Sequence, residues 1–386
     1  MAADRLRLSL DVTAVPANPV GAGQYTVQLA RALSQRPDLD RVMVARSRDR
    51  SRWTTVAPES KLVTAAPERR PLRLAWEQVR LPALLKQQAV DVHHGPHYTM
   101  PEHAKVPVVV TVHDLSFFVE PQWHERSKVL LFQRAIKVAA RRARVVVCPS
   151  QATADELARW CQIDADVVVA HHGVDLDRFG PTERVPGSDA ARLSTVPAGR
   201  GGSLADGTPF LAFVGTLEPR KDVPTLVRAF TQVAGRHPDA RLVLAGGAGW
   251  GASKVEEAVA ASGLGHRIIR PGYVGDEVIP ALFRSAVAVV YPALYEGFGL
   301  PALEAMACGA PVVTTSGSAM EEVAGDAAIL VRPGDTVALS GALESVLAGS
   351  GSDPDRTQRG LDIAARHTWA ASADRHMEAY RRAAGK

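Results

Sequence analysis

The sequence predicts an α/β protein that folds as two domains with parallel β-sheets. Its 386 residues exceed the length that a single hydrophobic core usually supports. The apolar run over residues 106–112 is typical of a central strand in a parallel sheet, because both faces of such a strand are buried. Residues 286–313 give a second indication of this fold class, namely an apolar strand, a glycine loop, a helix that Pro301 opens, and another apolar strand.

The composition is that of a soluble globular protein, with 46% hydrophobic and 22% charged residues and a formal net charge of +4. No run of eighteen apolar residues occurs, so we expect neither a transmembrane helix nor a signal peptide. Cys148, Cys161 and Cys308 are odd in number and lack the spacing of a metal site, which favours a reduced, cytoplasmic setting. The mild positive charge suggests anionic substrates or a membrane surface.

A glycine-containing loop joins the first predicted strand, 5–12, to the first predicted helix, 24–33. Gly21 and Gly23 lie in this loop at the helix N-terminus. A dinucleotide fingerprint of dehydrogenases is a weak match, because Thr26 stands where the third glycine belongs and no acidic residue clearly ends a second strand about twenty positions on. A tight turn without a ligand is the alternative.

Basic residues gather on a predicted helix over 127–144, which also carries apolar residues at helical spacing. One hypothesis is that its basic face contacts a membrane surface or lipid phosphates, and the other is a surface helix that packs only on its own domain. The basic run 46–52 is interpreted as a solvated loop. No nucleic-acid-binding motif accompanies these charges, so we expect no nucleic-acid partner.

His113 follows the strand 106–112 directly, at the strand end where open α/β sheets bind their ligands. His93, His94 and His97 come at the end of a neighbouring short strand. Three histidines so spaced could suggest metal ligands, but no partner set of carboxylates accompanies them.

The second domain begins with a strand over 210–215, followed by Thr216 and the adjacent cations Arg220 and Lys221. Two adjacent cations between a strand and a helix can neutralise a diphosphate leaving group. A surface-exposed basic pair is the alternative. The preceding residues 181–207 are rich in Gly, Pro, Ser and Ala, which predicts a linker and a flexible loop.

Two carboxylates flank the glycine loop that precedes the helix opened by Pro301. Glu296 comes directly before Gly297 and Gly299, and Glu304 falls in the first turns of the helix. Backbone N–H groups of the glycines can point at a bound anion with help from the helix dipole. The arrangement therefore favours a negatively charged ligand that bears hydroxyl groups.

The stretch from Glu296 to Gly309, EGFGLPALEAMACG, resembles the E-x7-E element of retaining glycosyltransferases of family 4, mannosyltransferase-like subgroup. The resemblance extends over nearly the whole chain and is strongest from 210 to 335. It implies the GT-B fold, in which two Rossmann-like β/α/β domains face a central cleft. The acceptor-side domain would cover 1–180, completed by a C-terminal helix over 366–386, and the donor-binding domain would cover 208–365.

The resemblance implies catalytic roles for four residues. Arg220 and Lys221 would stabilise the departing diphosphate, Glu296 would hold sugar and phosphate, and His113 would line the reacting face. Glu304 would bind the ribose hydroxyls. The other donor-binding positions would be Gly21, Gly23, Thr216, Val274, Gly297, Phe298, Gly299 and Leu300, with main-chain groups near Val274 reading the nucleobase. Many relatives have an arginine at the place of Thr216, so either Arg220 takes over that contact or the phosphate clamp is weaker.

We therefore expect a metal-independent, cofactor-free hexosyltransferase that moves mannose from GDP-mannose to a glycan or lipid-linked acceptor with retention. No carboxylate is obviously poised as a covalent nucleophile, so the family implies a front-face route. Asp175 and Asp177 imitate a metal-binding DxD motif but are interpreted as an inter-domain segment, and His93, His94 and His97 as an acceptor-side loop.

The sequence is also compatible with three other functions. They are a UDP-sugar-dependent glucosyltransferase, a GT-B nucleotide-sugar epimerase, and a non-catalytic binding descendant. A cytoplasmic location is expected, and peripheral contact with the inner membrane face through the basic helix is a further hypothesis.

Overall fold

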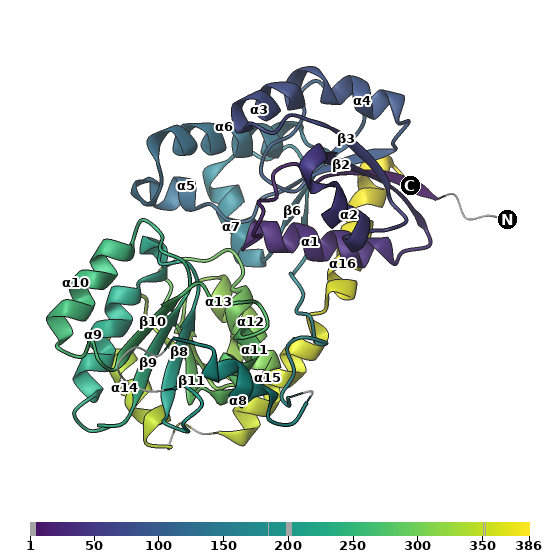
Figure 1. Ribbon diagram of the computed structural model, residues 1–386. Helices are drawn as coiled ribbons and strands as arrows, with labels where there is room; N and C mark the ends of the chain where they lie inside the picture. The colour runs from purple at the N-terminus through teal and green to yellow at the C-terminus, as the bar shows by residue number, and fades with distance from the viewer. Residues whose placement is uncertain (1–4, 184, 198–202, 350, 352) are drawn as a thin grey trace. The chain divides into compact units, whose positions relative to one another are not determined.

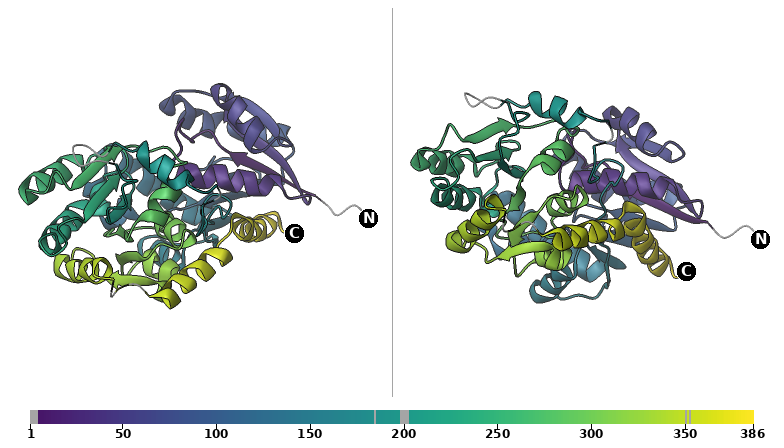
Figure 2. Two further views of the ribbon diagram at one scale, coloured as in Figure 1. Left: turned by 60° about the horizontal axis from the view of Figure 1, so that its bottom comes forward. Right: turned by 90° about the horizontal axis from the view of Figure 1, so that it is seen from below.

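The chain forms two compact units, each built on one parallel β-sheet. The computed structural model describes residues 5–183, 185–197, 203–349, 351 and 353–386. Unit 1 comprises Met1–Gly173 and Trp369–Lys386, and unit 2 comprises Val174–Thr368. Helices lie on both faces of each sheet (Figures 1 and 2), which is the doubly wound arrangement.

The seven-stranded sheet of unit 1 has the order β3-β2-β1-β4-β5-β6-β7. Its strands are β1 (Leu6–Asp11), β2 (Leu39–Arg46), β3 (Lys61–Ala66), β4 (Val92–Gly95), β5 (Val108–Thr111), β6 (Val145–Cys148) and β7 (Asp166–Val169). Its helices are α1 (Ala22–Ser34), α2 (Arg50–Val56), α3 (Arg70–Val79), α4 (Leu81–Gln87), α5 (Ser116–Val119), α6 (Arg126–Arg142), α7 (Gln151–Trp160) and α16 (Trp369–Ala384). The C-terminal helix α16 thus belongs to the unit that the N-terminal residues form, where it contacts α1, β5 and β6.

The six-stranded sheet of unit 2 has the order β10-β9-β8-β11-β12-β13. Its strands are β8 (Phe210–Val214), β9 (Arg241–Ala245), β10 (Ile268–Gly272), β11 (Ala288–Tyr291), β12 (Val312–Thr315) and β13 (Ala328–Val331). Its helices are α8 (Ser188–Ser194), α9 (Val223–Val233), α10 (Ala252–Ser262), α11 (Ile279–Ser285), α12 (Leu300–Ala307), α13 (Ala319–Ala324), α14 (Thr336–Leu347) and α15 (Pro354–Arg366).

The strand order of unit 2 reverses between β8 and β11, which pair in parallel. Such a reversal is the topological switch point of the sheet, and open α/β sheets bind ligands there, at the carboxyl ends of the strands. The loops after β8 and β11 carry the cations Arg220 and Lys221 and the carboxylate Glu296. The topology therefore brings residues about 75 positions apart to one end of the sheet.

Two predictions about loops are wrong. The described part of 181–207 is not a linker, because it contains α8 and buries Leu193, Val196 and Leu204 in the core of unit 2; residues 184 and 198–202 lie outside the described residues. The basic run 46–52 is not simply solvated. Arg46 ends β2, is only 4% exposed, and forms an ion pair of 2.6 Å with Asp49.

In the described parts of the chain, no helix has both the length and the apolar character needed to cross a membrane.

Candidate functional site

The candidate donor site lies at the carboxyl ends of β8 and β11 in unit 2. After β8, a short 3₁₀ turn over Pro219–Lys221 leads into α9. After β11, the loop 292–299 leads into α12. The two loops are tied together because the backbone N–H of Leu294 donates a hydrogen bond of 2.8 Å to the carbonyl oxygen of Arg220. This bond holds the cation loop against the carboxylate loop.

Glu296 is the counter-ion of both cations. One guanidinium nitrogen of Arg220 lies 2.5 Å from Glu296 Oε1, and Lys221 Nζ forms an ion pair with the same oxygen. Lys221 Nζ also bonds the hydroxyl of Tyr291, and its charge lies 4.4 Å from the centre of the Tyr291 ring. A further carboxylate, Glu218, accepts a hydrogen bond of 2.9 Å from Arg220 Nε. Two positive charges and one shared carboxylate thus form a compact group at the switch point of the sheet.

Burial and charge act in opposite directions on this group. Burial lowers the pKa of Lys221 to about 8, with a further contribution from the neighbouring charge of Arg220, while Glu296 opposes the shift. Burial alone would raise the pKa of Glu296, but the charges of Arg220 and Lys221 outweigh it and hold the pKa below its usual value. Near neutral pH, Lys221 is therefore mostly a cation and Glu296 a carboxylate.

Glu304 lies on α12, and its environment differs from that of Glu296. Burial raises the pKa of Glu304 to about 7, and the charge of Arg178 only partly opposes this. Among the described residues, no hydrogen bond or ion pair reaches its carboxyl group. A carboxyl group with an elevated pKa and open acceptor positions is suited to bind a ligand that donates hydrogen bonds.

Two glycines allow the loops of this site to approach closely. At Gly246, which has φ of +148°, an added Cβ would overlap the backbone carbonyl of Gly215, so the loop after β9 lies directly on the loop after β8. Gly299, which has φ of +100°, precedes α12, and an added Cβ there would overlap Met320 Sδ. Both positions require the positive φ and the missing side chain of glycine.

The other predicted donor-binding residues lie near this end of the sheet without joining the ion-paired group. Thr216 is half-buried in the loop after β8, and Val274 is buried after β10. Phe298 is 4% exposed and belongs to the core of unit 2. The structure therefore brings together Arg220, Lys221 and Glu296.

Unit 1 contains the remaining predicted residues. His113 follows β5 and is 8% exposed; its Nε2 lies 2.7 Å from the carbonyl oxygen of Pro96, so this nitrogen donates. Burial lowers the pKa of His113. Gly21 and Gly23 lie at the N-terminus of α1, where Gly21 is the capping residue.

Sequence reasoning missed Tyr291 and Arg178. Tyr291 is the last residue of β11, so its position at the carboxyl end of a parallel strand is the signal that could have found it. Arg178 gives no comparable signal, since it reaches the surroundings of Glu304 only through the fold.

The interpretation of His93 and His94 as loop residues is wrong. Both lie within β4 and are fully buried, where His93 Nδ1 is 3.1 Å from Ser9 Oγ and His94 Nδ1 is 2.8 Å from the Tyr380 hydroxyl. Asp175 accepts a hydrogen bond of 3.1 Å from the backbone N–H of Asp177, which makes this segment a local turn. No group of three or more metal-ligating side chains occurs among the residues that the structure covers.

Known proteins resemble both halves of the chain. Residues 19–178 match the family described as Glycosyltransferase Family 4, and residues 200–362 match the family described as Glycosyl transferases group 1. O-antigen chain mannosyltransferase B from Escherichia coli is 30% identical over 318 residues, which cover 81% of this chain and 77% of that protein. D-inositol 3-phosphate glycosyltransferase from Salinispora tropica is 33% identical over 260 residues, or 64% of this chain and 53% of the relative.

Solved structures show the same fold. Sucrose-phosphate synthase from Thermosynechococcus elongatus superposes with a TM-score of 0.76 at 23% identity, covering 98% of both chains. A glycosyltransferase involved in lipopolysaccharide biosynthesis, WaaG, gives a TM-score of 0.70 at 15% identity over 97% of this chain and 98% of that one. The chain therefore belongs to glycosyltransferase family 4, has the GT-B fold, and is a hexosyltransferase.

Proposed function

We propose that this enzyme moves mannose from GDP-mannose to a glycan or lipid-linked acceptor, with retention of configuration at the transferred carbon. The observation that carries the proposal is the group formed by Arg220, Lys221 and Glu296 at the switch point of unit 2. The relationship to a mannosyltransferase supports mannose as the sugar.

In this proposal Arg220 and Lys221 bind the diphosphate of the donor. Negative charge grows on the leaving diphosphate as the bond to the sugar breaks, and preorganised cations in a partly buried site stabilise that charge. Lys221 is 6% exposed, so its charge is poorly screened by water. When the phosphates take up the cations, Glu296 becomes available to accept hydrogen bonds from sugar hydroxyls.

The start of α12 and Glu304 would bind the rest of the donor. Backbone N–H groups of Gly297 to Leu300 precede or open α12, where the helix dipole favours an anion. Glu304 would accept hydrogen bonds from the two ribose hydroxyls. Thr216 and main-chain groups near Val274 complete the proposed donor set.

Unit 1 would supply the acceptor side. His113 would line the reacting face, with Gly21 and Gly23 facing the donor phosphates from the loop before α1. The proposed route uses no carboxylate as a nucleophile; the leaving phosphate would instead assist deprotonation of the acceptor hydroxyl.

The donor is tested by mixing the purified protein with GDP-mannose, UDP-glucose or ADP-glucose and an acceptor extract, and measuring release of each nucleoside diphosphate. GDP release with transfer of mannose supports the proposal. Release of UDP alone would show that the donor is a UDP-sugar and not GDP-mannose. Nucleotide release with donor alone and formation of an altered sugar would indicate an epimerase, and no turnover of any of the three would refute GDP-mannose as the donor. NMR of the product gives the configuration at the new bond.

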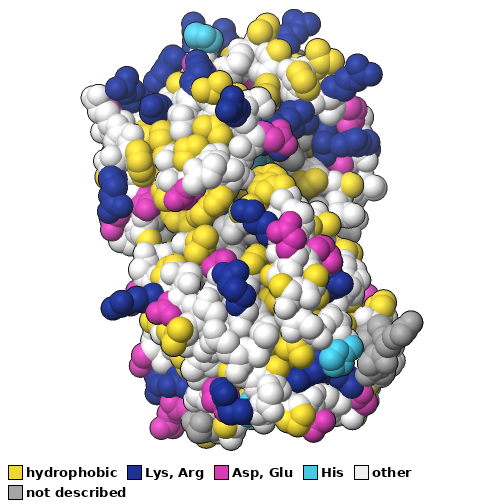
Figure 3. Space-filling model, turned by 90° about the vertical axis from the view of Figure 1, so that its left-hand side faces the viewer, with side chains coloured by type: hydrophobic (Ala, Val, Ile, Leu, Met, Phe, Trp, Pro, Cys, Tyr) yellow, Lys and Arg dark blue, Asp and Glu magenta, His cyan; other side chains and the backbone are white. Residues whose placement is uncertain are grey.

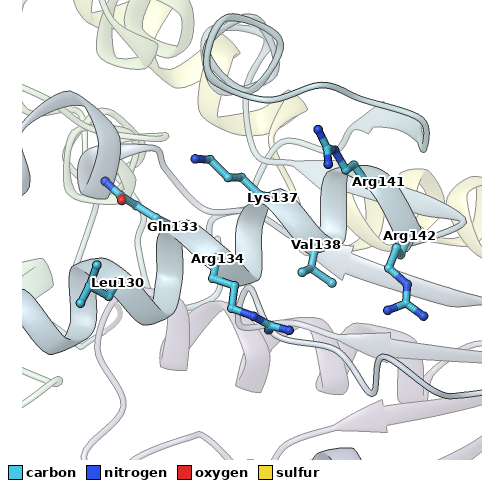
Figure 4. A pocket seen from close by; sticks show the side chains of 7 residues that line it. All are labelled: Leu130, Gln133, Arg134, Lys137, Val138, Arg141 and Arg142. Carbon is cyan, nitrogen blue, oxygen red and sulfur yellow. The ribbon is translucent and has the colours of Figure 1, made fainter.

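Peripheral membrane contact through α6 is a second, separate proposal. Figure 4 shows side chains along α6 that border a shallow hollow of about 450 Å³, lined by Leu130, Gln133, Arg134, Lys137, Val138, Arg141 and Arg142. Leu130 is 72% exposed, which suits an apolar contact beside basic groups. Against it, Arg134 and Arg142 both pair with Glu102, and on the face in Figure 3 basic side chains are interspersed with acidic ones.

Vesicle sedimentation tests this contact. The protein should sediment with anionic phospholipid vesicles and less with zwitterionic ones, and Lys137→Gln with Arg141→Gln should reduce sedimentation at low salt. Equal sedimentation of the parent and the double variant would show that α6 does not bind the membrane.

A further inference from the structure

A chain of buried hydrogen bonds runs through the interior of unit 1 and begins and ends on α16. The Tyr380 hydroxyl lies 2.8 Å from His94 Nδ1, and His94 Nε2 lies 2.8 Å from Thr111 Oγ1. Thr111 Oγ1 lies 2.9 Å from the Tyr25 hydroxyl, which lies 2.7 Å from His376 Nε2. All five side chains are 0% exposed. The chain thus links α16 to β4, β5 and α1 without water.

When both histidines are neutral, one carbonyl group fixes the direction of every bond in this hydrogen-bond chain. His376 Nδ1 lies 2.7 Å from the backbone oxygen of Ser372, which can only accept, so His376 donates through Nδ1. A neutral ring then accepts at Nε2, so Tyr25 donates to His376. Thr111 must therefore donate to Tyr25, His94 must donate to Thr111 through Nε2, and Tyr380 must donate to His94.

The chain requires both histidines to be neutral and to be opposite tautomers. His94 carries its proton on Nε2, whereas His376 carries its proton on Nδ1. A second proton on His376 would turn Nε2 into a donor that faces the donating hydroxyl of Tyr25. All the bonds would have to reverse together, and the Tyr380 hydroxyl would then lose its acceptor in the chain.

The surroundings oppose such a proton. Burial, followed by the neighbouring His376, His93, His113 and His97, lowers the pKa of His94 well below its usual value. Burial lowers the pKa of His376 to about 4, and His113 adds to this effect although the Ser372 carbonyl opposes it. His172, whose pKa is also lowered by burial, faces both His113 and His376. Asp114 acts in the opposite direction and raises the pKa of His113.

Tyr25 connects the chain to the residue proposed for the reacting face. Its ring meets the His113 ring edge-to-face at a centroid distance of 4.9 Å and lies 4.7 Å from the ring of His172. Because its hydroxyl forms hydrogen bonds with both Thr111 and His376, the Tyr25 side chain cannot move away from His113 without breaking them. His113 is therefore held between Tyr25 and its bond to the carbonyl of Pro96.

We propose that this neutral-histidine chain fixes α16 in unit 1 and makes Tyr25 a positioning residue for His113, and that acid disables the chain. The positioning part rests on the proposed transferase function. The hydrogen-bond chain does not depend on that function, so it is tested first by measurements that require no enzyme activity.

NMR of the full chain labelled with ¹⁵N-histidine tests the tautomers at pH 7.5. We expect His94 as the neutral Nε2–H form and His376 as the neutral Nδ1–H form, with the two signals assigned through His94→Gln and His376→Gln. A charged His376, or His376 with its proton on Nε2, would overturn the proposal whether or not the protein transfers sugar.

Tyr25→Phe keeps the ring over His113 and removes both bonds of the hydroxyl. We expect the melting temperature of this variant to fall by about 4 °C or more, because buried partners are left unsatisfied. Tyr273→Phe, at a tyrosine that is 61% exposed, should melt like the parent. Equal melting temperatures of Tyr25→Phe and the parent would refute the stabilising hydrogen-bond chain.

In the transfer assay, Tyr25→Phe should lower kcat at least about fivefold and leave the KM for the donor within about twofold, because donor contacts are unchanged. A structural role alone would leave kcat of the folded variant unchanged, and that result would overturn the positioning part. If the parent protein transfers no sugar, the proposed function fails, while the tautomer and melting results still decide the chain.

Acid unfolding completes the test. A histidine whose pKa is lower in the folded state than in the unfolded state binds its proton mainly after unfolding. The free energy of unfolding therefore falls as the pH drops from about 6.5 toward 4. Each such histidine raises the equilibrium constant of unfolding about tenfold for each pH unit of this drop. Tryptophan fluorescence reports unit 1, which holds five of the six tryptophans. His376→Gln should reduce this slope by about one proton, whereas His103→Gln, at an exposed histidine, should not. Equal slopes for the parent and His376→Gln would contradict acid release.

Discussion

Replacing Lys221 by alanine tests the proposed stabilisation of the leaving diphosphate. In the parent, Lys221 Nζ pairs with Glu296 and bonds the Tyr291 hydroxyl in a site where only 8% of the lysine side chain is exposed. The variant loses one of two cations, while Arg220 stays 2.5 Å from Glu296. Removing a preorganised group that stabilises developing charge costs about 3 kcal/mol, so kcat should fall about 10²-fold or more.

The assay is nucleoside diphosphate release at saturating donor, with melting temperatures measured in parallel. Lys254→Ala is the matched control, because Lys254 is an exposed lysine of the same unit. A folded Lys221→Ala protein whose kcat lies within threefold of the parent would refute the assigned role. A loss in Lys254→Ala of equal size would show that general charge, and not the position of Lys221, matters.

Two further predictions concern α12. Since the pKa of Glu304 is about 7, donor binding to the ionised form should release a proton, and affinity should weaken as pH falls below 7, by up to about tenfold per pH unit. Calorimetry in buffers of different ionisation enthalpy measures that proton release. Glu304→Gln should abolish the release and weaken nucleotide binding. Unaltered affinity of this variant would show that Glu304 does not bind the ribose. Gly299→Ala should destabilise the protein by about 1–3 kcal/mol in chemical unfolding, because the residue has a positive φ and its Cβ would meet Met320. Gly265→Ala, where an added Cβ is 3.9 Å from the nearest atom, is the control, and equal loss in both variants would contradict the steric argument.

The parts of the fold that sequence predicts well are those with local signals. The strand 106–112 and the unit around Pro301 follow from apolar runs, a proline at a helix start and glycines, which act over a few residues. Because open α/β sheets bind ligands at the carboxyl ends of their strands, the sequence also predicts that His113 and the loop with Arg220 and Lys221 lie at such strand ends. The pairing of Lys221 with Glu296 spans 75 positions and depends on the order of strands, which residue patterns do not determine.

The errors have the same physical origin. The segment 181–207 has a linker composition, yet three widely spaced apolar residues suffice to dock its described part on unit 2. Arg46 has the charge of a surface residue, but Asp49 makes its burial tolerable. His94 and His376 are 282 positions apart, and only the return of α16 to unit 1 brings them into one hydrogen-bonded chain.

The ion pairs of Glu296 have a consequence for which anions can occupy the site. Since this carboxylate already pairs with Arg220 and Lys221, inorganic phosphate must first displace an internal competitor, and it then offers that carboxylate only the P–OH groups of an anion of like charge. A sugar diphosphate can replace the lost cations with its own hydroxyl groups. The resting protein should therefore tolerate millimolar phosphate with little inhibition, and this selectivity would be lost in Glu296→Ala.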